Sequence, residues 1–243
     1  MMYIEKNPMS AEVVAYEKEL ADNLLDKENL VDDAIHPTLD GPGVYDTVKS
    51  FTAFEGLKNR MFADQGGICC YCGCRLQYPN HPQYIVEHVI PKEKNRTLAG
   101  EYENLLLSCR STAEEEKQRM SARKKERNSF FHCDKAKESR VLPITPLQTD
   151  CQEFFKYDEF GGIIGIGNDA QNTVDTLNLG CNWLKKRREA AIEGEIFDDE
   201  GNLLSDEELI QRLDTIMNVD EEGHYAEFCF AIKSAIQGLL SQK

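Results

Sequence analysis

Four cysteines in the middle of the chain have the residue type and spacing of a zinc site. Cys69 and Cys72 form a C-x2-C pair, a spacing that lets two thiolates turn back onto one tetrahedral ion. Two more ligands must come from elsewhere in the chain. Cys109 and Cys133 are the natural candidates, because each follows a short apolar or aromatic segment. The sequence therefore predicts a structural zinc held by these four thiolates.

The cysteine count of nine favours metal binding over disulfides. An odd number cannot pair completely within one chain, and the thiols of a cytosolic protein are kept reduced. Burial as a small hydrophobic side chain is the alternative role. We expect it for the isolated Cys151, Cys181 and Cys229, and for one or both of Cys70 and Cys74.

A group of polar residues lies between the two halves of the cysteine set. Glu87-His88 comes shortly before Pro91, and Asn104 follows a few residues later. An imidazole with a pKa of about 6.5 can act as a base near neutral pH, although a lone histidine is more often a core residue bonded to backbone. Asn104 is equally suited to a turn or cap, because asparagine bonds local backbone well.

In their order, these residues resemble the HNH endonucleases, and in particular the PtuB-like branch found in Septu and retron anti-phage systems. Two departures from the usual pattern stand out. Cys109 and Cys133 are far apart in the sequence where a second tight pair is usual, and Asp134 stands where Asn or His is usual. The residues that carry the resemblance are Cys69, Cys72, Glu87, His88, Pro91, Asn104, Leu105, Cys109, Cys133, Asp134 and Lys137.

The resemblance implies a ββα-metal nuclease core that hydrolyses phosphodiester bonds, with DNA favoured over RNA as substrate. His88 would be the general base, oriented by a carbonyl or by Asn104, the second catalytic residue. Glu87 and Asp134 would hold a catalytic Mg²⁺ or Mn²⁺. Because neighbouring strand residues point to opposite sides, Glu87 and His88 must straddle a bend or a strand end. His132 is a rival for metal or phosphate binding.

The resemblance also implies partners. Septu-like systems pair the HNH protein with a PtuA-like ATPase, and retron versions add a reverse transcriptase and its RNA-DNA product. The expected role is therefore that of the effector in an anti-phage defence complex.

The charge distribution limits how the chain can meet nucleic acid. With 28 basic and 43 acidic side chains, the net charge is -15, which argues against coating nucleic acid with the whole surface. Lys92, Lys94 and Arg96, just after the histidine, are predicted to contact phosphates, as is Lys137 by the resemblance. The basic stretch 117–127 could serve likewise or be a solvated face, and the acidic stretch 195–227 could dock a basic partner.

Apolar spacing predicts a mainly helical α+β fold in three regions: N-terminal helices (1–66), a zinc-containing core (67–143), and a hairpin with C-terminal helices (144–243). Residues 113–127 are expected to form an exposed helix or loop, because they lack an apolar stripe. Helices are predicted from Ser10 to before Pro37 and near 48–62, 134–140, 174–191, 205–217 and 223–240; strands are predicted at 84–90, 105–108, 154–157 and 163–166.

Two other function classes remain open at this stage. One is a zinc-stabilised adaptor that binds a partner and whose nuclease residues are vestigial, and the other is a redox-sensing thiol protein. No apolar run approaches the ~18 residues needed to cross a bilayer, and the start lacks the pattern of a secretory leader. The expected location is the cytoplasm.

Overall fold

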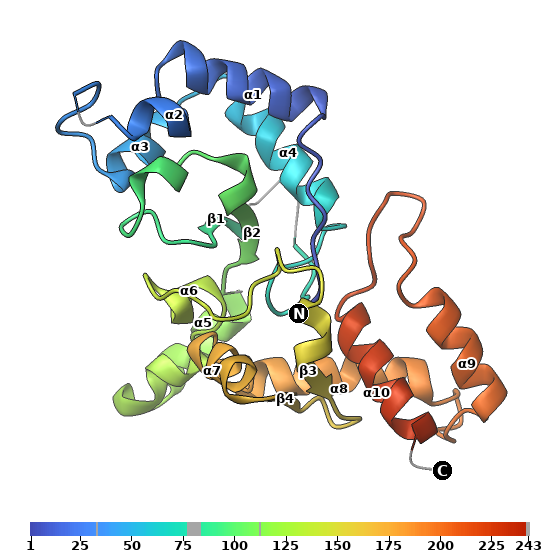
Figure 1. The fold of residues 1–243 in the computed structure, drawn as a ribbon. Helices are drawn as coiled ribbons and strands as arrows, with labels where there is room; N and C mark the ends of the chain where they lie inside the picture. Colours follow the sequence, from blue (N-terminus) through green and yellow to red (C-terminus); the bar gives the residue numbers. More distant parts are fainter. Residues whose placement is uncertain (33, 77–83, 112, 242–243) are drawn as a thin grey trace.

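The chain folds around a small two-stranded sheet with helices on both sides, as the computed structural model shows (Figure 1). The structure describes residues 1–32, 34–76, 84–111 and 113–241. The N-terminal helices lie on one side of the central sheet and the C-terminal helices on the other. The fold is α+β and mainly helical, as predicted.

The first predicted helix is confirmed at its start but ends early. α1 (Ala11–Asp22) is capped by Ser10, whose side chain accepts a hydrogen bond from the Val13 N–H. Leu24 then adopts a φ of 58°, and the N–H of Leu25 bonds back to the carbonyl of Leu20. A left-handed residue with such a bond ends a helix, so the segment before Pro37 forms a separate helix, α2 (Lys27–Leu30).

The helix predicted near 48–62 is present at 54–64, and a helix that was not predicted precedes it. The Asp40 side chain accepts a hydrogen bond from the Gly43 N–H and caps the start of α3 (Gly41–Val48). Proline at position 42 is compatible with this helix, because it lies in the first turn. α4 (Phe54–Asp64) follows. The buried Gln65, just after α4, donates to the carbonyls of Ile68 and Leu107 and accepts from the Leu107 N–H. Gln65 therefore fixes the end of α4 against the central sheet.

The central sheet consists of β1 (Tyr84–His88) and β2 (Leu105–Cys109), paired antiparallel so that His88 lies opposite Leu105 and Tyr84 opposite Cys109. Two short 3-10 turns, η1 (Arg96–Leu98) and η2 (Tyr102–Asn104), lie in the connection. All five residues of β2 are buried. Both strands were predicted at these places.

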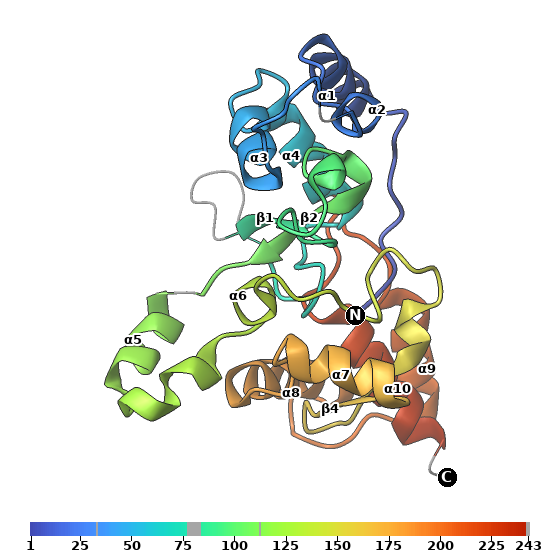
Figure 2. The ribbon, with the colours of Figure 1, turned by 60° about the vertical axis from the view of Figure 1, so that its left-hand side comes forward.

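A projecting segment and then a short helix follow the sheet. α5 (Ala113–Ser121) and the 3-10 helix η3 (Lys124–Phe130) extend away from the body of the molecule (Figure 2). The chain then returns through Cys133 to the short α6 (Asp134–Lys137), beside the sheet. The exposed helix predicted for 113–127 is thus present.

The C-terminal region begins with the predicted hairpin. The helix predicted near 205–217 is present, and the one predicted at 223–240 begins only at Cys229, after Phe228 with a φ of 57°. The helix predicted near 174–191 is divided, because Asn178 adopts a φ of 50° between its two parts. The elements are η4 (Cys151–Phe154), β3 (Phe155–Tyr157), β4 (Ile163–Gly165), α7 (Asn168–Thr176), α8 (Asn182–Ile196), α9 (Asp206–Thr215) and α10 (Cys229–Ser241).

Buried apolar side chains from all three regions belong to one hydrophobic cluster. The first residues of the chain cross to the C-terminal region, where the Ile4 N–H donates to the carbonyl of Pro146 at 2.8 Å. Among the described residues, the structure contains no helix with the length and apolarity that crossing a bilayer requires.

Candidate metal centre and acidic pocket

The four predicted cysteines converge at one end of the central sheet. The Sγ atoms of Cys69 and Cys133 lie 3.9 Å apart, and those of Cys72 and Cys109 lie 3.7 Å apart. Every other pair among the four lies within 4.8 Å, and all four side chains are buried. Zinc–sulfur bonds of about 2.3 Å in a tetrahedron place sulfurs about 3.8 Å apart. The set therefore fits a structural zinc.

Local backbone structure turns the first two thiols toward the centre. The Gly73 N–H bonds to the carbonyl of Cys69, and the Cys69 N–H bonds to the carbonyl of Cys74. Gly73 has a φ of 80°, and a Cβ there would lie 2.5 Å from the ring of Phe230, so this tight turn requires glycine. The Cys109 N–H also points at the Cys69 sulfur, at 3.3 Å.

Two further side chains lie beside the four cysteines. Cys74 groups with Cys69, Cys72 and Cys109, and His132 groups with Cys72, Cys109 and Cys133. The Nδ1 of His132 lies 3.3 Å from the Cys133 sulfur and 3.7 Å from that of Cys109. His132 therefore belongs to the cysteine cluster and does not line the acidic pocket described next.

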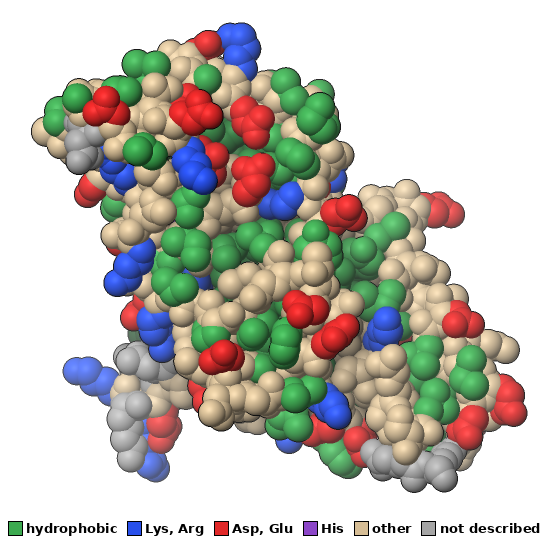
Figure 3. Space-filling view, in the orientation of Figure 1, with side chains coloured by type: hydrophobic (Ala, Val, Ile, Leu, Met, Phe, Trp, Pro, Cys, Tyr) green, Lys and Arg blue, Asp and Glu red, His purple; other side chains and the backbone are tan. Residues whose placement is uncertain are grey.

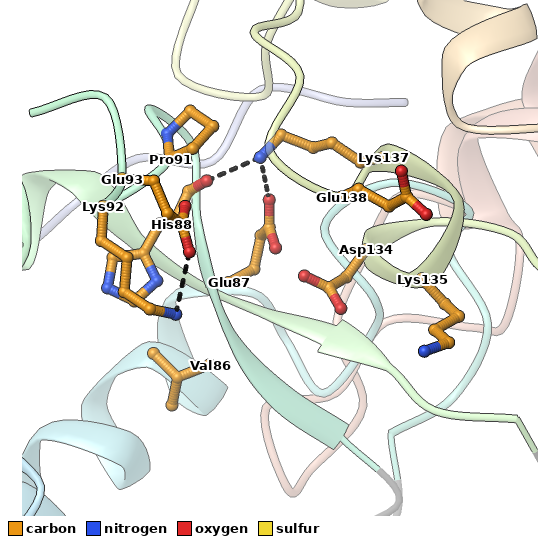
Figure 4. A pocket seen from close by; sticks show the side chains of 10 residues that line it. All are labelled: Val86, Glu87, His88, Pro91, Lys92, Glu93, Asp134, Lys135, Lys137 and Glu138. Atoms are coloured by element: carbon orange, nitrogen blue, oxygen red, sulfur yellow. Dashed lines mark hydrogen bonds and ion pairs between the residues drawn. The ribbon is translucent and has the colours of Figure 1, made fainter. Parts of the chain in front are cut away.

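An open pocket of about 230 Å³ lies where the end of β1 meets α6. It has room for a phosphate group and several waters, since one water takes about 30 Å³. Of the predicted site residues, Glu87, His88, Lys92, Asp134 and Lys137 line it. Figure 4 shows the carboxylates of Glu87 and Asp134 facing the same space, with the Lys137 ammonium against Glu87.

Glu87 is a buried carboxylate with several partners. It is 2% exposed, and its Oε1 accepts a hydrogen bond from the Tyr71 hydroxyl at 2.8 Å and lies 2.6 Å from the Lys137 ammonium. Burial, and next the adjacent Asp134, raise the pKa of Glu87 to about 8, although Lys137 opposes the shift. With that pKa, Glu87 carries a proton near neutral pH, and a divalent cation that binds between the two groups would displace it. Once ionised, the two carboxylates are oxygen ligands of the kind Mg²⁺ prefers.

His88 ends β1 on the other side of the same pocket. Its Nε2 lies 3.0 Å from the carbonyl of Ala99, so in the neutral ring Nε2 carries the hydrogen and Nδ1 keeps a lone pair. Tyr45 packs edge-on against the imidazole, with centroids 4.5 Å apart. Burial and the nearby Lys92 lower the pKa of His88 to about 4. The ring is therefore neutral at pH 7 and can accept a proton.

This pKa predicts a pH dependence of stability. The unfolded chain takes up the His88 proton at about pH 6.5 and the folded protein only at about pH 4. The stabilisation is complete above pH 6.5 and is lost as the pH falls toward 4, by at most about 1.4 kcal/mol per pH unit. Urea unfolding of zinc-loaded wild type and His88→Gln should show a free-energy difference that changes over this window. A difference that stays constant would contradict the neutral, buried imidazole.

Asn104 supports the loop behind the pocket and does not touch the imidazole. Its amide nitrogen donates to the carbonyls of Ile90 and Leu98, and its amide oxygen accepts from the Ile90 N–H at 2.7 Å. Of the two predicted ways to orient His88, the structure has the carbonyl, at Ala99. The prediction of Asn104 as an orienter of the ring is therefore wrong, because its bonds are taken by the backbone.

Removing the Asn104 side chain should destabilise the protein. Asn104→Ala deletes three hydrogen bonds worth about 1 kcal/mol each and leaves buried backbone groups unpaired, so we expect the free energy of unfolding to fall by about 2 to 4 kcal/mol. The control is Asn172→Ala, at an exposed position on α7, where a surface change is worth about 0.5 kcal/mol or less. Equal losses in denaturant titrations of the two variants would show that the loop does not depend on Asn104.

The predicted phosphate contacts divide into two groups. Lys92 lines the pocket, and Lys94 is exposed beside it. Arg96 is used inside the fold, because its guanidinium donates to the carbonyls of Leu30, His36 and Leu39. Lys137 is 1% exposed and donates to the carbonyl of His88 at 2.8 Å as well as pairing with Glu87. Arg96 is therefore corrected from a phosphate contact to an internal support, whereas Lys137 lines the pocket from a buried position.

The cysteine cluster and the pocket are joined through single residues. The hydroxyl of Tyr71, which lies between Cys70 and Cys72, donates a hydrogen bond to Glu87. Asp134 directly follows Cys133. Sequence reasoning missed Tyr71, Tyr45 and Ala99, since no spacing or composition signal marks them.

A scan against models of known protein families finds no match for this chain, and a search of curated proteins finds none either.

Proposed function

We propose that this chain is a metal-dependent endonuclease of HNH type that hydrolyses phosphodiester bonds in nucleic acid. One observation carries the proposal: a neutral imidazole and a pair of carboxylates line one pocket, above a cluster of thiols that fits zinc. β1 and the short α6 contribute side chains to the pocket, and β2 pairs with β1. This order of two strands and a helix supports the ββα arrangement that the resemblance implies.

The chemistry assigns each side chain a role. Glu87 and Asp134 would hold a divalent cation, which supplies neutralisation of charge on the scissile phosphate and the leaving oxygen. His88 accepts a proton from the attacking water at Nδ1, while its Nε2–H stays on the Ala99 carbonyl. Lys92 and Lys135, which also line the pocket, bind the non-bridging phosphate oxygens. Lys137 and Tyr71 keep Glu87 in place.

The zinc assignment is part of the proposal. We assign Cys69, Cys72, Cys109 and Cys133 as ligands, with Cys74 and His132 as neighbours outside the coordination sphere. The Cys69–Cys133 and Cys72–Cys109 sulfur distances are close to the tetrahedral value, and the other pairs lie within 4.8 Å. Structural zinc sites are typically closed by four such ligands.

The test is cleavage of DNA and RNA by the zinc-loaded protein, alone and with any ATPase that co-purifies with it. We expect cleavage to require Mg²⁺ or Mn²⁺ and to be lost in Glu87→Gln and Asp134→Asn. Glu93→Gln is the matched control, because Glu93 lines the same pocket but is exposed. Cleavage that persists in both carboxylate variants would instead favour the zinc-stabilised adaptor. So would the absence of cleavage by wild type, both alone and with a co-purifying ATPase.

The wider role rests on the resemblance alone. It is that of the effector in an anti-phage complex with a PtuA-like ATPase, and in retron systems with a reverse transcriptase and its product. The acidic surface of α9, where Asp206, Glu207 and Glu208 form the first turn, offers a place for a basic partner.

A further inference from the structure

The long gap between Cys109 and Cys133 forms a structure of its own. We call residues 113–130, comprising α5 and η3, the basic arm. Residues 117–127 of the arm contain six lysines and arginines and a single acid, Glu126. The start of α5 adds Glu114, Glu115 and Glu116, so the arm has six basic and four acidic side chains and a net charge of +2, whereas the whole chain has a net charge of -15. Glu116 pairs with Arg119. Figure 2 shows the arm projecting from the body. A positive element on an acidic protein calls for a partner of opposite charge.

Among the side chains of the arm that the structure describes, none is buried. Met120, the one large apolar side chain in the middle of α5, is 56% exposed. Lys117, Arg123 and Lys124 are also exposed. A helix without a buried face gains little from packing. Lys117, Arg123 and Lys124 are therefore displayed to solvent on a segment that extends outward from the body of the protein.

The root of the arm is fixed close to the acidic pocket. The ring of Phe131 lies between the Arg119 guanidinium, 5.3 Å from its centroid, and the Lys135 ammonium, 5.4 Å away. The Asn178 amide donates to the carbonyls of Ser129 and Phe131. Since Lys135 also lines the pocket, positive charge continues from the pocket wall to the arm.

The surface view shows the same track. In Figure 3, several Lys and Arg side chains lie along the left edge, from beside the central sheet down toward the arm. Acidic side chains lie over α9 at the right and also over the N-terminal helices. A phosphate chain lying in the pocket and continuing past Lys135 would meet the arm next.

We propose that the basic arm binds the sugar-phosphate backbone of nucleic acid and directs it across the acidic pocket. This inference extends the proposed function, because it names the surface that delivers the substrate. An acidic protein surface, such as α9 of a second copy, is the other possible occupant. Nucleic acid is favoured because the cations of the arm continue into a pocket sized for a phosphate.

The test compares two triple variants with the same change in charge. The arm variant carries Lys117→Gln, Arg123→Gln and Lys124→Gln. The control carries Lys18→Gln, Lys27→Gln and Lys186→Gln, at exposed positions of α1, α2 and α8. Binding of full-length, zinc-loaded protein to DNA and RNA duplexes and single strands is measured by fluorescence anisotropy between about 50 and 200 mM salt.

We expect the arm variant to bind at least about tenfold more weakly than wild type, with a salt slope smaller by about three. The control should stay within about twofold of wild type. The relative loss on DNA and RNA then identifies which nucleic acid the arm prefers. Unchanged zinc content and circular dichroism show that the arm variant is folded.

Three results would overturn the inference: equal binding by the two variants, no nucleic-acid binding by wild type, or a change in self-association alone. Failure of the nuclease proposal gives a different result. If binding depends on the arm but no divalent cation supports cleavage, the inference stands and the catalytic assignment falls. If wild type cleaves and the arm variant cleaves and binds equally well, the catalytic assignment stands and the inference about the arm falls.

Discussion

Replacing His88 with alanine is expected to reduce phosphodiester cleavage by roughly 10²- to 10⁴-fold, the usual contribution of a general base. The variant loses the Nδ1 lone pair but keeps the carboxylates of Glu87 and Asp134. Zinc content and thermal stability report separately whether the fold survives. Single-turnover cleavage, with the divalent cation and substrate in excess, isolates the chemical step from substrate binding.

The control for this prediction is another histidine. His224 packs edge-on against Phe62 and does not line the acidic pocket, so His224→Ala should cleave at the wild-type rate. If His88→Ala and wild type cleave equally, His88 is a core histidine and the catalytic assignment is wrong. Because the pKa of His88 is about 4, the wild-type rate should not fall between pH 7 and 5 through this group.

Removing zinc is expected to unfold the core. Structural zinc contributes about 10 to 16 kcal/mol of apparent binding free energy near pH 7, which is as large as the whole stability of a typical domain. A strong chelator, or Cys72→Ser, should abolish cooperative thermal unfolding and lower the zinc content, measured by elemental analysis, from one ion per chain to none. A zinc-free wild-type protein with an unchanged unfolding transition would contradict this.

The ligand assignment can be resolved within the same experiment. Cys69→Ser, Cys109→Ser and Cys133→Ser should behave like Cys72→Ser, whereas Cys74→Ser and His132→Ala should retain one zinc. Cys151→Ser is the control, since this buried thiol lies outside both candidate metal groups. Zinc lost from the Cys74 or the His132 variant would place that residue in the coordination sphere.

The sequence predicted the residues of the site better than their contacts. The C-x2-C pair and the two distant cysteines were recognisable because thiolate ligands have few other roles in a reduced protein. Glu87 and His88 were expected to straddle a bend or a strand end within a strand predicted at 84–90. β1 ends at His88, and both side chains line one pocket.

The errors have a common physical origin. Arg96 was expected to contact phosphate, but it donates to three carbonyls from the N-terminal region. Lys137, assigned by the resemblance, lines the pocket but also pairs with the buried Glu87. Such partners lie far away in the sequence, so local charge patterns cannot reveal them. The same holds for Asn104, whose bonds with two backbone segments appear only once the loop is folded.

Helix ends were mispredicted where the backbone adopts a left-handed conformation. Leu24 and Asn178 both have positive φ values. Leu24 follows the end of α1, and Asn178 separates α7 from α8. Apolar periodicity continues through both positions, so spacing alone predicted uninterrupted helices. A leucine at such a position is uncommon, and tertiary contacts must select it.

The central claim is that Glu87 and Asp134 form a divalent-cation site beside His88, supported by the neighbouring cysteine cluster. Counting Mn²⁺ bound to zinc-loaded protein, by electron paramagnetic resonance, tests it most directly and does not depend on substrate or partner. We expect one Mn²⁺ per chain in wild type and in His88→Ala, and none in Asp134→Asn. No Mn²⁺ in wild type, or equal binding by Asp134→Asn, would contradict the claim.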